Sequence, residues 1–582
     1  MKSVAIIGSG PSAIYLLKNM LLGLENASNQ IEEISIYEKR ALPGIGMPYH
    51  PETTDIHNMA NISSDEIPFL FITLEDWVRE QDAVFFEKYD INPSKINGST
   101  LFRRLVLGEY FHSQFRLCCE KLRAMAVNVT VNGGTEIIDI HYHETYCNLL
   151  SNIGQIFTAQ TVFIATGHQF NVRDDRGEKY FSSPWPISKI LPKKHNYHNF
   201  SIGILGASLS AFDVVASLAH RHGRFESVDN RFVYLPFENT EAFNMVLHDV
   251  NGWLPHLQYE QQSALRKVYR FIDKEHLWAL VDEDGFLSLD VFFDRVCRPV
   301  LHRALLKDEE QSLAQDLLQP EFKLNDFIER MARKHEYQNA FEGLEVEMKE
   351  AEKLNFEHEP SHWKENLDDL MFCLNYHAEL LSAEDYLYYK ETMQPFLMNV
   401  IAALPIESAK KLLALYDAKK IDLIAGSVNL DQIAIGEKVQ VSVEDEQKST
   451  THDYDMFICC GGQKDVELEE YPFPSLIASG TVSTALKRFK DYSELEAPEA
   501  SFNWVVKDDI QYLKAPGIAI TNDYRLINRQ GRAVENVYDI TFCHAAGLRP
   551  YAYGLQACAT TAEIAVSHWM TALNKPSLEM NM

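Results

Sequence analysis

The first forty residues constrain the fold of this chain most strongly. Residues 4–7 (Val-Ala-Ile-Ile) form a short apolar run typical of a buried parallel strand. The run breaks at Gly8-Ser9-Gly10-Pro11-Ser12-Ala13, and residues 14–22 continue as an apolar stretch long enough for a packed helix. Residues 34–37 predict a second strand, which Glu38 closes. Strand, glycine turn, helix, strand and acid together form the fingerprint of a dinucleotide-binding unit.

Each position of this fingerprint has a physical role. Gly8 makes the tight turn, Gly10 lets the backbone approach a pyrophosphate, and Ala13 occupies the small position where helix and strand pack closely. The helix N-terminus offers free N–H groups to phosphates. Glu38 is expected to accept hydrogen bonds from the ribose hydroxyls, although the polar stretch 25–33 places it beyond the usual spacing of about 20 residues. The alternative is an α/β unit that binds no phosphate.

Composition excludes several classes of protein. A length of 582 residues predicts about three to four domains. The net charge of −29 argues against nucleic acid as a partner, because phosphate contacts need Lys and Arg. We find no apolar run near the roughly 20 residues of a membrane span, no signal peptide and no metal-ligand spacing. The nine cysteines form no C-x-x-C pair, and free thiols indicate a cytoplasmic protein.

The plan of the first unit recurs later in the chain. Residues 201–205 predict a strand, 206–211 a turn and 212–219 a helix, and the apolar strand 455–462 ends in glycine as residues 161–167 do. This repetition indicates an internal duplication. The predicted fold is α/β, with two Rossmann-like dinucleotide-binding domains, the second inserted in the first, plus a mainly helical insertion. The predicted boundaries are 1–195 and 450–582 for the first domain, 196–254 and 420–449 for the second, and 255–419 for the insertion.

The insertion is rich in Glu, Leu, Lys and Ala, and residues 363–381 and 383–404 show helical spacing. Pro395 is expected to kink or break the second of these helices. His377 stands alone and is expected at the surface. The insertion is predicted to cap the active site. Residues 516–520 and 537–542 predict strands that restore the first domain, and Gly554 begins a closing helix.

Together these segments resemble the flavoproteins with two dinucleotide-binding domains, and more closely the FAD/NAD(P)-binding proteins related to flavin-dependent N-hydroxylating monooxygenases. The resemblance rests on segments from both ends and the middle of the chain: residues 8–13, Glu38, 44–61, 165–168, 183–186, 206–213, 251–255 and 554–556. It implies that the first fold holds FAD, that the second delivers a nicotinamide, and that the closing helix points at the flavin ring.

The resemblance also implies an activity. The chain is expected to be an FAD-dependent oxidoreductase, namely an NAD(P)H-dependent monooxygenase that hydroxylates a small-molecule amine or activated ring through a flavin peroxide. The alternatives are an FAD-dependent dehydrogenase or reductase without oxygenation, and an FAD-binding scaffold protein that has lost nicotinamide use. No side chain is assigned as catalytic, and His57, Asn58 and His168 are flavin-side candidates only.

The second turn departs from the family pattern. Ser208 stands where the middle glycine is expected, and its Cβ would obstruct a pyrophosphate, so nicotinamide is expected to bind loosely. Asp249 stands near the end of the second strand with no arginine beside it, which favours NADH at least as much as NADPH. The predicted cofactor-binding residues are Gly8, Gly10, Pro11, Ser12, Ala13, Glu38, Lys39, Gly46, Met47, His57, Asn58, Thr166, Gly167, His168, Gly206, Ser208, Ser210, Gly554, Leu555 and Gln556.

Overall fold

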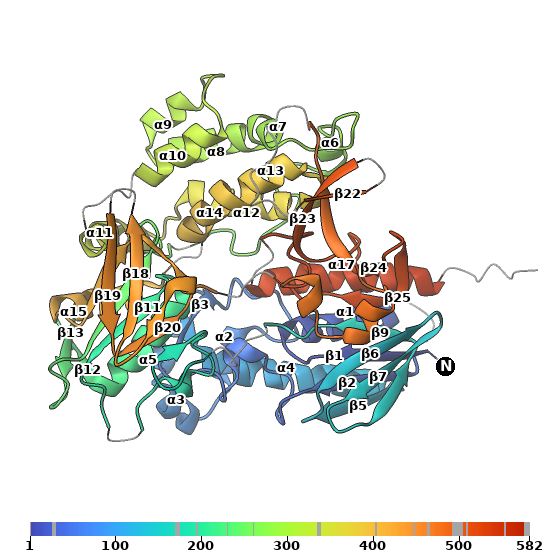
Figure 1. Ribbon diagram of the computed structural model, residues 1–582, viewed down its shortest axis with the longest axis horizontal. Coiled ribbons are helices and arrows are strands. Elements are labelled where there is room, and N and C mark those ends of the chain that lie inside the picture. The colour runs from blue at the N-terminus through green and yellow to red at the C-terminus, as the bar shows by residue number, and fades with distance from the viewer. Residues whose placement is uncertain are drawn as a thin grey trace, which may run out of the picture.

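The first unit is built on a six-stranded sheet (Figure 1). The computed structural model of the chain describes residues 2–25, 31–168, 175–193, 196–229, 231–259, 261–333, 339–401, 404–445, 448–462, 466–491, 504–507, 510–551 and 554–574. All neighbouring strands of the sheet are parallel except the edge pair β24–β25. In spatial order the strands are β24 (Arg525–Ile527), β25 (Ala533–Asp539), β9 (Thr161–Ile164), β1 (Ser3–Ile7), β2 (Glu33–Glu38) and β5 (Asn128–Gly133).

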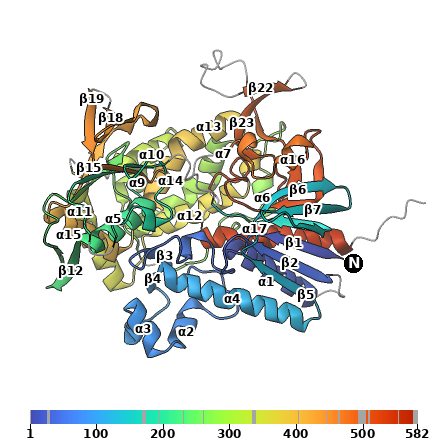
Figure 2. The ribbon, with the colours of Figure 1, turned by 60° about the horizontal axis from the view of Figure 1, so that its bottom comes forward.

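Both faces of this sheet are covered, which is why β1 and β9 are continuous apolar runs. Helix α1 (Pro11–Glu25) lies between α4 (Arg104–Ala124) and α17 (Gly554–Asn574) on one face (Figure 2). A small antiparallel sheet of β6 (Ile137–His143), β7 (Tyr146–Ser151) and β8 (Ile156–Ala159) covers the other. The last described helix therefore completes the fold that the first strand begins.

The second unit repeats the plan with a five-stranded parallel sheet. Its strands, in spatial order, are β10 (Tyr180–Phe181), β20 (Met456–Cys459), β11 (Ser201–Leu205), β14 (Asn244–Asp249) and β15 (Ile421–Ala425). Helix α5 (Leu209–His222) follows β11 as α1 follows β1. The predicted α/β class and the duplicated, inserted topology are confirmed.

The predicted boundary at residue 450 requires correction. Strand β20 pairs with β11, and β19 (Lys448–Tyr454) pairs with β18 (Val439–Asp445), so both lie in the second unit. The apolar run 455–462 contains β20, which occupies in the second unit the place that β9, in residues 161–167, occupies in the first. This correspondence accounts for the glycine at the end of both runs. We propose that the second unit ends at about residue 460, and the rest of the domain division stays a proposal.

Smaller sheets and short helices complete the two units. Among the described residues, two small sheets have two strands each: β3 (Met59–Ser63) with β4 (Leu101–Arg103), and β12 (Gly223–Val228) with β13 (Arg231–Pro236). In two further sheets, β16 (Ser427–Val428) and β17 (Ala434–Ile435) pair with β18, and β21 (Thr484–Arg488) and β22 (Trp504–Lys507) pair with β23 (Ile510–Ile518). The short helices are α2 (Leu74–Arg79), α3 (Ala83–Tyr89), α15 (Ile406–Asp417) and α16 (Pro474–Ala478).

The insertion is helical, as predicted, and lies above both units in Figure 1. Its core includes Ala485, Phe489 and Leu513 of the β21–β23 sheet, and α11 packs with α15 in the core of the second unit. Its helices are α6 (Lys274–Trp278), α7 (Leu289–Phe292), α8 (Arg298–Lys307), α9 (Gln311–Asp316), α10 (Leu324–Arg333), α11 (Ala340–Glu357), α12 (His362–Asn375), α13 (Ala383–Tyr388) and α14 (Gln394–Val400). None of the described helices is long and apolar enough to cross a membrane.

The interruption expected near Pro395 is present, whereas the position of His377 differs from expectation. Residues 389–393 are π-helical, and Pro395 stands in the first turn of α14, where its missing N–H costs little. His377 is buried, not at the surface, and its Nε2 lies 3.0 Å from the Tyr269 hydroxyl oxygen. The prediction for His377 was wrong because sequence spacing within one segment does not show which other segments cover it.

Candidate functional site

Gly8 ends β1 in a backbone conformation that favours glycine, with φ of +100°. Its N–H donates to the Tyr37 carbonyl oxygen at 2.8 Å. An added Cβ would lie 2.2 Å from the carbonyl oxygen of Ala165, which follows β9. The turn is therefore fixed against both neighbouring strands, and no larger residue fits at position 8.

Gly10 and Gly46 bring two loops into close approach. An added Cβ on Gly10 would lie 3.1 Å from the Gly46 Cα atom, and one on Gly46 would lie 2.6 Å from Pro11 Cδ. Gly46 has φ of +84° and immediately precedes Met47, which begins a 3₁₀ turn. The loop from Gly44 to Met47 thus lies against the first turn, and only residues without a Cβ allow this.

Glu38 lies at the first turn, as the fingerprint predicts. Its Oε2 accepts hydrogen bonds from the Ser9 N–H at 3.2 Å and from the Ser9 hydroxyl at 2.7 Å, and its Oε1 accepts from the Arg40 N–H at 3.0 Å. Ser9 Oγ accepts from the Gly44 N–H at 2.8 Å. Sequence reasoning passed over Ser9, which joins the acid to the loop. The predicted residue Lys39 is exposed.

The closing helix returns to the same place. The Ser12 hydroxyl donates to the thiol sulfur of Cys558 at 3.2 Å, so the beginnings of α1 and α17 lie side by side. Ala13 is fully buried at the close packing position. Thr166 N–H donates to the Thr541 hydroxyl oxygen at 3.2 Å, which joins the strand ends β9 and β25. Gly167 and His168 follow Thr166, and Gly554 begins α17 with φ of +84°.

Both polar atoms of the Gln556 side-chain amide make hydrogen bonds to the backbone. Its Oε1 accepts from the Arg266 N–H at 2.6 Å, and its Nε2 donates to the Ala264 carbonyl oxygen at 2.9 Å. Its neighbour Leu555 is buried in the core of the first unit. The amide of Gln556 therefore joins the start of α17 to the segment that leads into the insertion.

These features test whether the residues fit FAD. The glycine pair leaves a backbone surface without side chains, the acid stands beside it, and the N-terminus of α1 adjoins both. The described residues therefore fit the pyrophosphate and ribose of a dinucleotide. No group of three or more His, Cys, Asp or Glu side chains within the described ranges is placed to hold a metal ion.

The second turn reproduces the first in detail. Gly206 has φ of +105°, and its N–H donates to the His248 carbonyl oxygen at 2.8 Å, the same contact that Gly8 makes. An added Cβ on Gly206 would lie 3.0 Å from the Cys460 carbonyl oxygen. Ser208 precedes α5, and Ser210 lies in its first turn, so both predicted positions adjoin the helix N-terminus.

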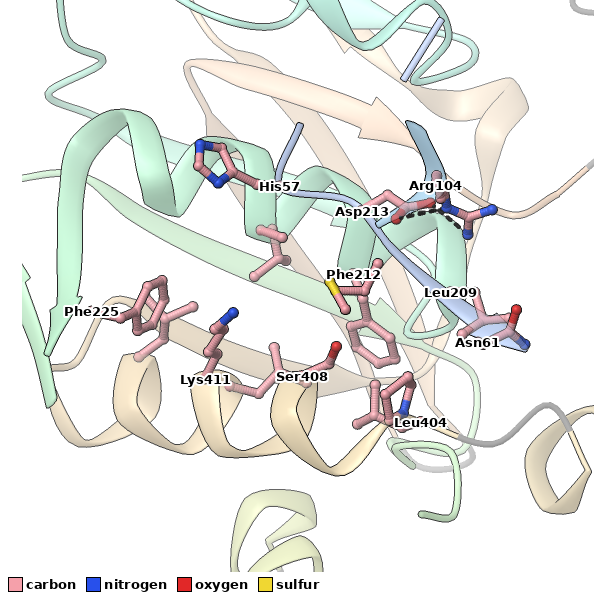
Figure 3. A pocket seen from close by; sticks show the side chains of 16 residues that line it. His57, Asn61, Arg104, Leu209, Phe212, Asp213, Phe225, Leu404, Ser408 and Lys411 are labelled. Carbon is pink, nitrogen blue, oxygen red and sulfur yellow. Dashed lines mark hydrogen bonds and ion pairs between the residues drawn. The ribbon is translucent and has the colours of Figure 1, made fainter. Parts of the chain in front are cut away.

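His57 and Asn58 lie away from the first turn, at the contact with the second unit. The His57 ring stacks on His220 of α5 with centroids 3.8 Å apart, and burial lowers the pKa of His57 to about 4. Asn58 is fully buried and donates to α5. His57, Arg104, Asp213 and Lys411 help to line a cavity of about 40 Å³ between the two units and α15 (Figure 3).

A second cavity, of about 70 Å³, lies between α12 and the segment bound by Gln556. We call it the α12 cavity. The Arg266 guanidinium Nε lies 2.7 Å from Asp368 Oδ2, while burial raises the pKa of Asp368. Its lining residues are Leu257, Gln258, Tyr259, Gln261, Ser263, Ala264, Arg266, Ser361, Lys364, Glu365, Asp368, Asp369, Val400 and Ile401. Sequence reasoning missed these residues, because no motif marks them.

Comparisons with known proteins agree with this assignment. Residues 5–169 match the sequence model of a family described as FAD-NAD(P)-binding, and residues 274–401 match that of the YdhS-like middle domain. The protein YdhS of Escherichia coli (strain K12) is 26% identical over 487 residues, which are 82% of this chain and 86% of YdhS. The match at residues 274–401 lies within the helical insertion.

Two solved structures are similar along most of their length. The ornithine hydroxylase PvdA from Pseudomonas aeruginosa has 11% identity and a TM-score of 0.49, over 98% of this chain and 99% of PvdA. The bacillithiol disulfide reductase Bdr from Staphylococcus aureus has 12% identity and a TM-score of 0.42, over 98% of this chain and 99% of Bdr. Likeness at this level carries no conclusion about substrate. The match of residues 5–169 to the FAD-NAD(P)-binding family confirms the predicted cofactors and the predicted class of FAD-dependent oxidoreductase.

Proposed function

We propose that the protein is an FAD-dependent monooxygenase that takes electrons from a nicotinamide and hydroxylates the nitrogen of a small amine. The amine would bind in the α12 cavity, beside the start of α17. In this proposal the insertion caps the reaction site and the two nucleotide-binding units supply FAD and the electron donor.

The observation that supports this substrate concerns two residues that line the cavity, each of which carries a buried acceptor atom. Asp368 Oδ1 and Gln258 Oε1 have no hydrogen-bond partner among the described residues. Buried acceptors without donors are costly, so both favour a ligand that brings N–H groups. An amine or ammonium group supplies such donors, whereas an aromatic ring without N–H groups does not.

The residues have separate roles in the proposed reaction. Asp368 Oδ1 accepts a hydrogen bond from the substrate ammonium and then its proton, which leaves a nucleophilic amine. Arg266 orients the carboxylate, and Gln556 holds the backbone of Arg266 against α17. Bound FAD would supply the redox chemistry between nicotinamide and oxygen. The balance is amine, O₂, NAD(P)H and one proton giving hydroxylamine, NAD(P)⁺ and water.

The test is oxygen consumption with a panel of diamines and cationic amino acids, with mass analysis of product formed under ¹⁸O₂. We expect one amine to give coupled uptake and a hydroxylated product carrying one ¹⁸O atom. Asp368→Asn should raise KM for that amine at least about tenfold, because a charge-assisted hydrogen bond is lost. Flavin reduction without any oxygenated product would instead indicate a reductase or dehydrogenase.

Asp308→Asn is the matched control. The Asp308 side chain is 13% exposed and that of Asp368 is 14% exposed, and both carboxylates belong to the insertion. Asp308 accepts from the N–H groups of His362 and Trp363 at the start of α12 and is not among the residues that line the cavity. Equal effects of the two substitutions on KM would contradict the proposed role of Asp368.

The second unit leads to a prediction about the nicotinamide. Asp249 is the last residue of β14, as Glu38 is the last residue of β2. Each carboxylate accepts a hydrogen bond from the backbone N–H two residues later, which for Asp249 Oδ2 is the Asn251 N–H at 3.0 Å. The equivalent acid favours a free ribose 2′-hydroxyl and repels a 2′-phosphate. Arg221, in the last turn of α5, pairs with Asp55, and Arg224, on β12, pairs with Glu226.

NADH is therefore expected to reduce the flavin at least as fast as NADPH at equal concentration. Anaerobic stopped-flow bleaching with each cofactor measures this. Asp249→Asn should improve binding of 2′,5′-ADP by about tenfold, because one like charge at about 4 Å is removed. A wild-type protein that strongly selects NADPH would overturn the role given to Asp249.

A further inference from the structure

A buried ion pair joins the two nucleotide-binding units. Arg104 begins α4 of the first unit, and Asp213 lies in the second turn of α5 (Figure 3). Arg104 Nη2 lies 2.9 Å from Asp213 Oδ2, and Arg104 Nε donates to Oδ1 at 3.3 Å. The side chains are 13% and 5% exposed, so water screens the pair little. The two-point contact fixes the direction of α5 as well as its distance.

Asn58 adds a second attachment to the same helix. Its Nδ2 donates to the Asp213 carbonyl oxygen at 2.9 Å and to the Ser217 hydroxyl oxygen at 3.0 Å. Its Oδ1 accepts from the Thr54 hydroxyl at 2.9 Å and from the Asp55 N–H at 2.8 Å. Both ends of the amide are thus used, one on the first unit and one on the second.

The two attachments form one continuous structure. The Arg104 N–H donates to the Asn58 carbonyl oxygen at 2.9 Å, so the residues that hold α5 also hold each other. The loop that ends at Asn58 begins where Gly46 meets Gly10 at the first turn. Helix α5 begins immediately after Gly206 and Ser208 at the second turn. The loop from Gly46 to Asn58, and the contacts of Asn58 and Arg104 with α5, therefore connect one nucleotide-binding turn to the other.

We propose that Arg104 and Asn58 are positioning residues, which fix the second turn relative to the first so that a nicotinamide reaches the flavin. This inference rests on the proposed function, in which hydride passes between the two units. Hydride transfer needs reacting atoms within about 3.5 Å, whereas units within one chain move relative to each other unless their contact is specific. A buried ion pair with an adjoining amide provides that specificity.

The test replaces the ion pair by apolar residues so that no charge is left buried and alone. The double variant Arg104→Met/Asp213→Leu is expected to fold, bind FAD and bind nicotinamide with unchanged affinity. Its anaerobic flavin reduction at saturating nicotinamide should fall at least about tenfold, because misplacement by about 1 Å is enough to slow transfer. Asn58→Ala should show the same loss of rate with unchanged affinity.

The control is Arg525→Met/Asp523→Leu, which removes a pair 15% and 24% exposed within the first unit. This variant should keep the wild-type rate of flavin reduction. Equal loss of rate in both double variants would show a general structural effect and overturn the proposal. Full rate in Arg104→Met/Asp213→Leu would overturn it as well.

A second measurement tests the positioning role without relying on flavin reduction. Spin labels at the exposed positions 87 and 437 report the distance between the units, and all nine native cysteines lie buried or half-buried. Wild-type protein should give one narrow distance distribution, which broadens in Arg104→Met/Asp213→Leu. An unchanged narrow distribution would overturn the positioning role. If neither NADH nor NADPH reduces the flavin of the wild-type protein, this result would count against the proposed function. The distance measurement would still test whether Arg104 fixes the two units relative to each other.

Discussion

Gly10→Val is expected to yield colourless protein that binds FAD at least about 100-fold more weakly than wild type. An added Cβ would lie 3.1 Å from the Gly46 Cα atom, so the branched side chain would push the Gly46 loop away from the turn that is proposed to hold the pyrophosphate. A 100-fold loss of affinity corresponds to about 3 kcal/mol of binding free energy. The flavin absorbance of purified protein and titration of the apoprotein with FAD measure the effect.

Gly436→Val is the matched control. Gly436 is exposed, and its added Cβ would have only the Lys438 carbonyl oxygen, 4.0 Å away, within reach. This variant should stay yellow with one FAD per chain. A Gly10→Val protein that keeps stoichiometric, tightly bound FAD would contradict the assignment of the first turn to the pyrophosphate.

Lys487→Met is expected to stabilise the protein by about 3 kcal/mol at pH 7. Lys487 lies on β21 and is 6% exposed, and burial lowers its pKa from 10.5 to about 7. That change corresponds to about 5 kcal/mol between the two protonation states. The hydrogen bond from Lys487 Nζ to the Ala378 carbonyl oxygen offsets part of it, since a net hydrogen bond contributes about 1 kcal/mol.

The stabilisation expected for Lys487→Met should depend on pH. Between pH 7 and pH 10.5 the unfolded chain binds the Lys487 proton and the folded chain does not, so wild-type stability rises with pH across this range. The advantage of Lys487→Met is therefore largest below pH 7 and disappears as the pH approaches 10.5. Thermal unfolding at pH 7 and at pH 9.5 measures it, with a difference on the order of 5 °C at pH 7.

Lys490→Met controls for the loss of a lysine from the same part of the chain. Lys490 is 41% exposed and pairs with Asp282, which raises its pKa. Its replacement should give no stabilisation at pH 7. An unfolding temperature of Lys487→Met that exceeds wild type equally at both pH values would contradict burial of a lysine whose folded-state pKa is near 7.

The first turn shows how far a sequence can predict a site. Gly8, Gly10 and Glu38 lie within one local strand–turn–helix–strand unit, and the glycine requirement arises from the backbone itself. Such a requirement leaves a pattern in the sequence, and the second copy at Gly206 repeats it. Both turns could therefore be located in advance, together with the order of the strands around them.

The α12 cavity and the contact between the units show what the sequence did not reveal. Asp368 and Gln258 stand about 110 residues apart, and Asn58 meets Asp213 across 155 residues. None of these pairings follows from periodicity or spacing, because each depends on how separately folded segments pack. The same reason explains why the sequence did not show that β20 pairs with β11.

The sequence by itself determined the two nucleotide-binding folds, the helical insertion and the two glycine turns, because local backbone geometry and apolar periodicity encode them. Tertiary structure alone decided that Gln556 binds the segment entering the insertion, that His377 is buried, and that Asn58 holds α5. Burial and hydrogen-bond partners across long separations are properties of the packed chain, and only the packed chain displays them.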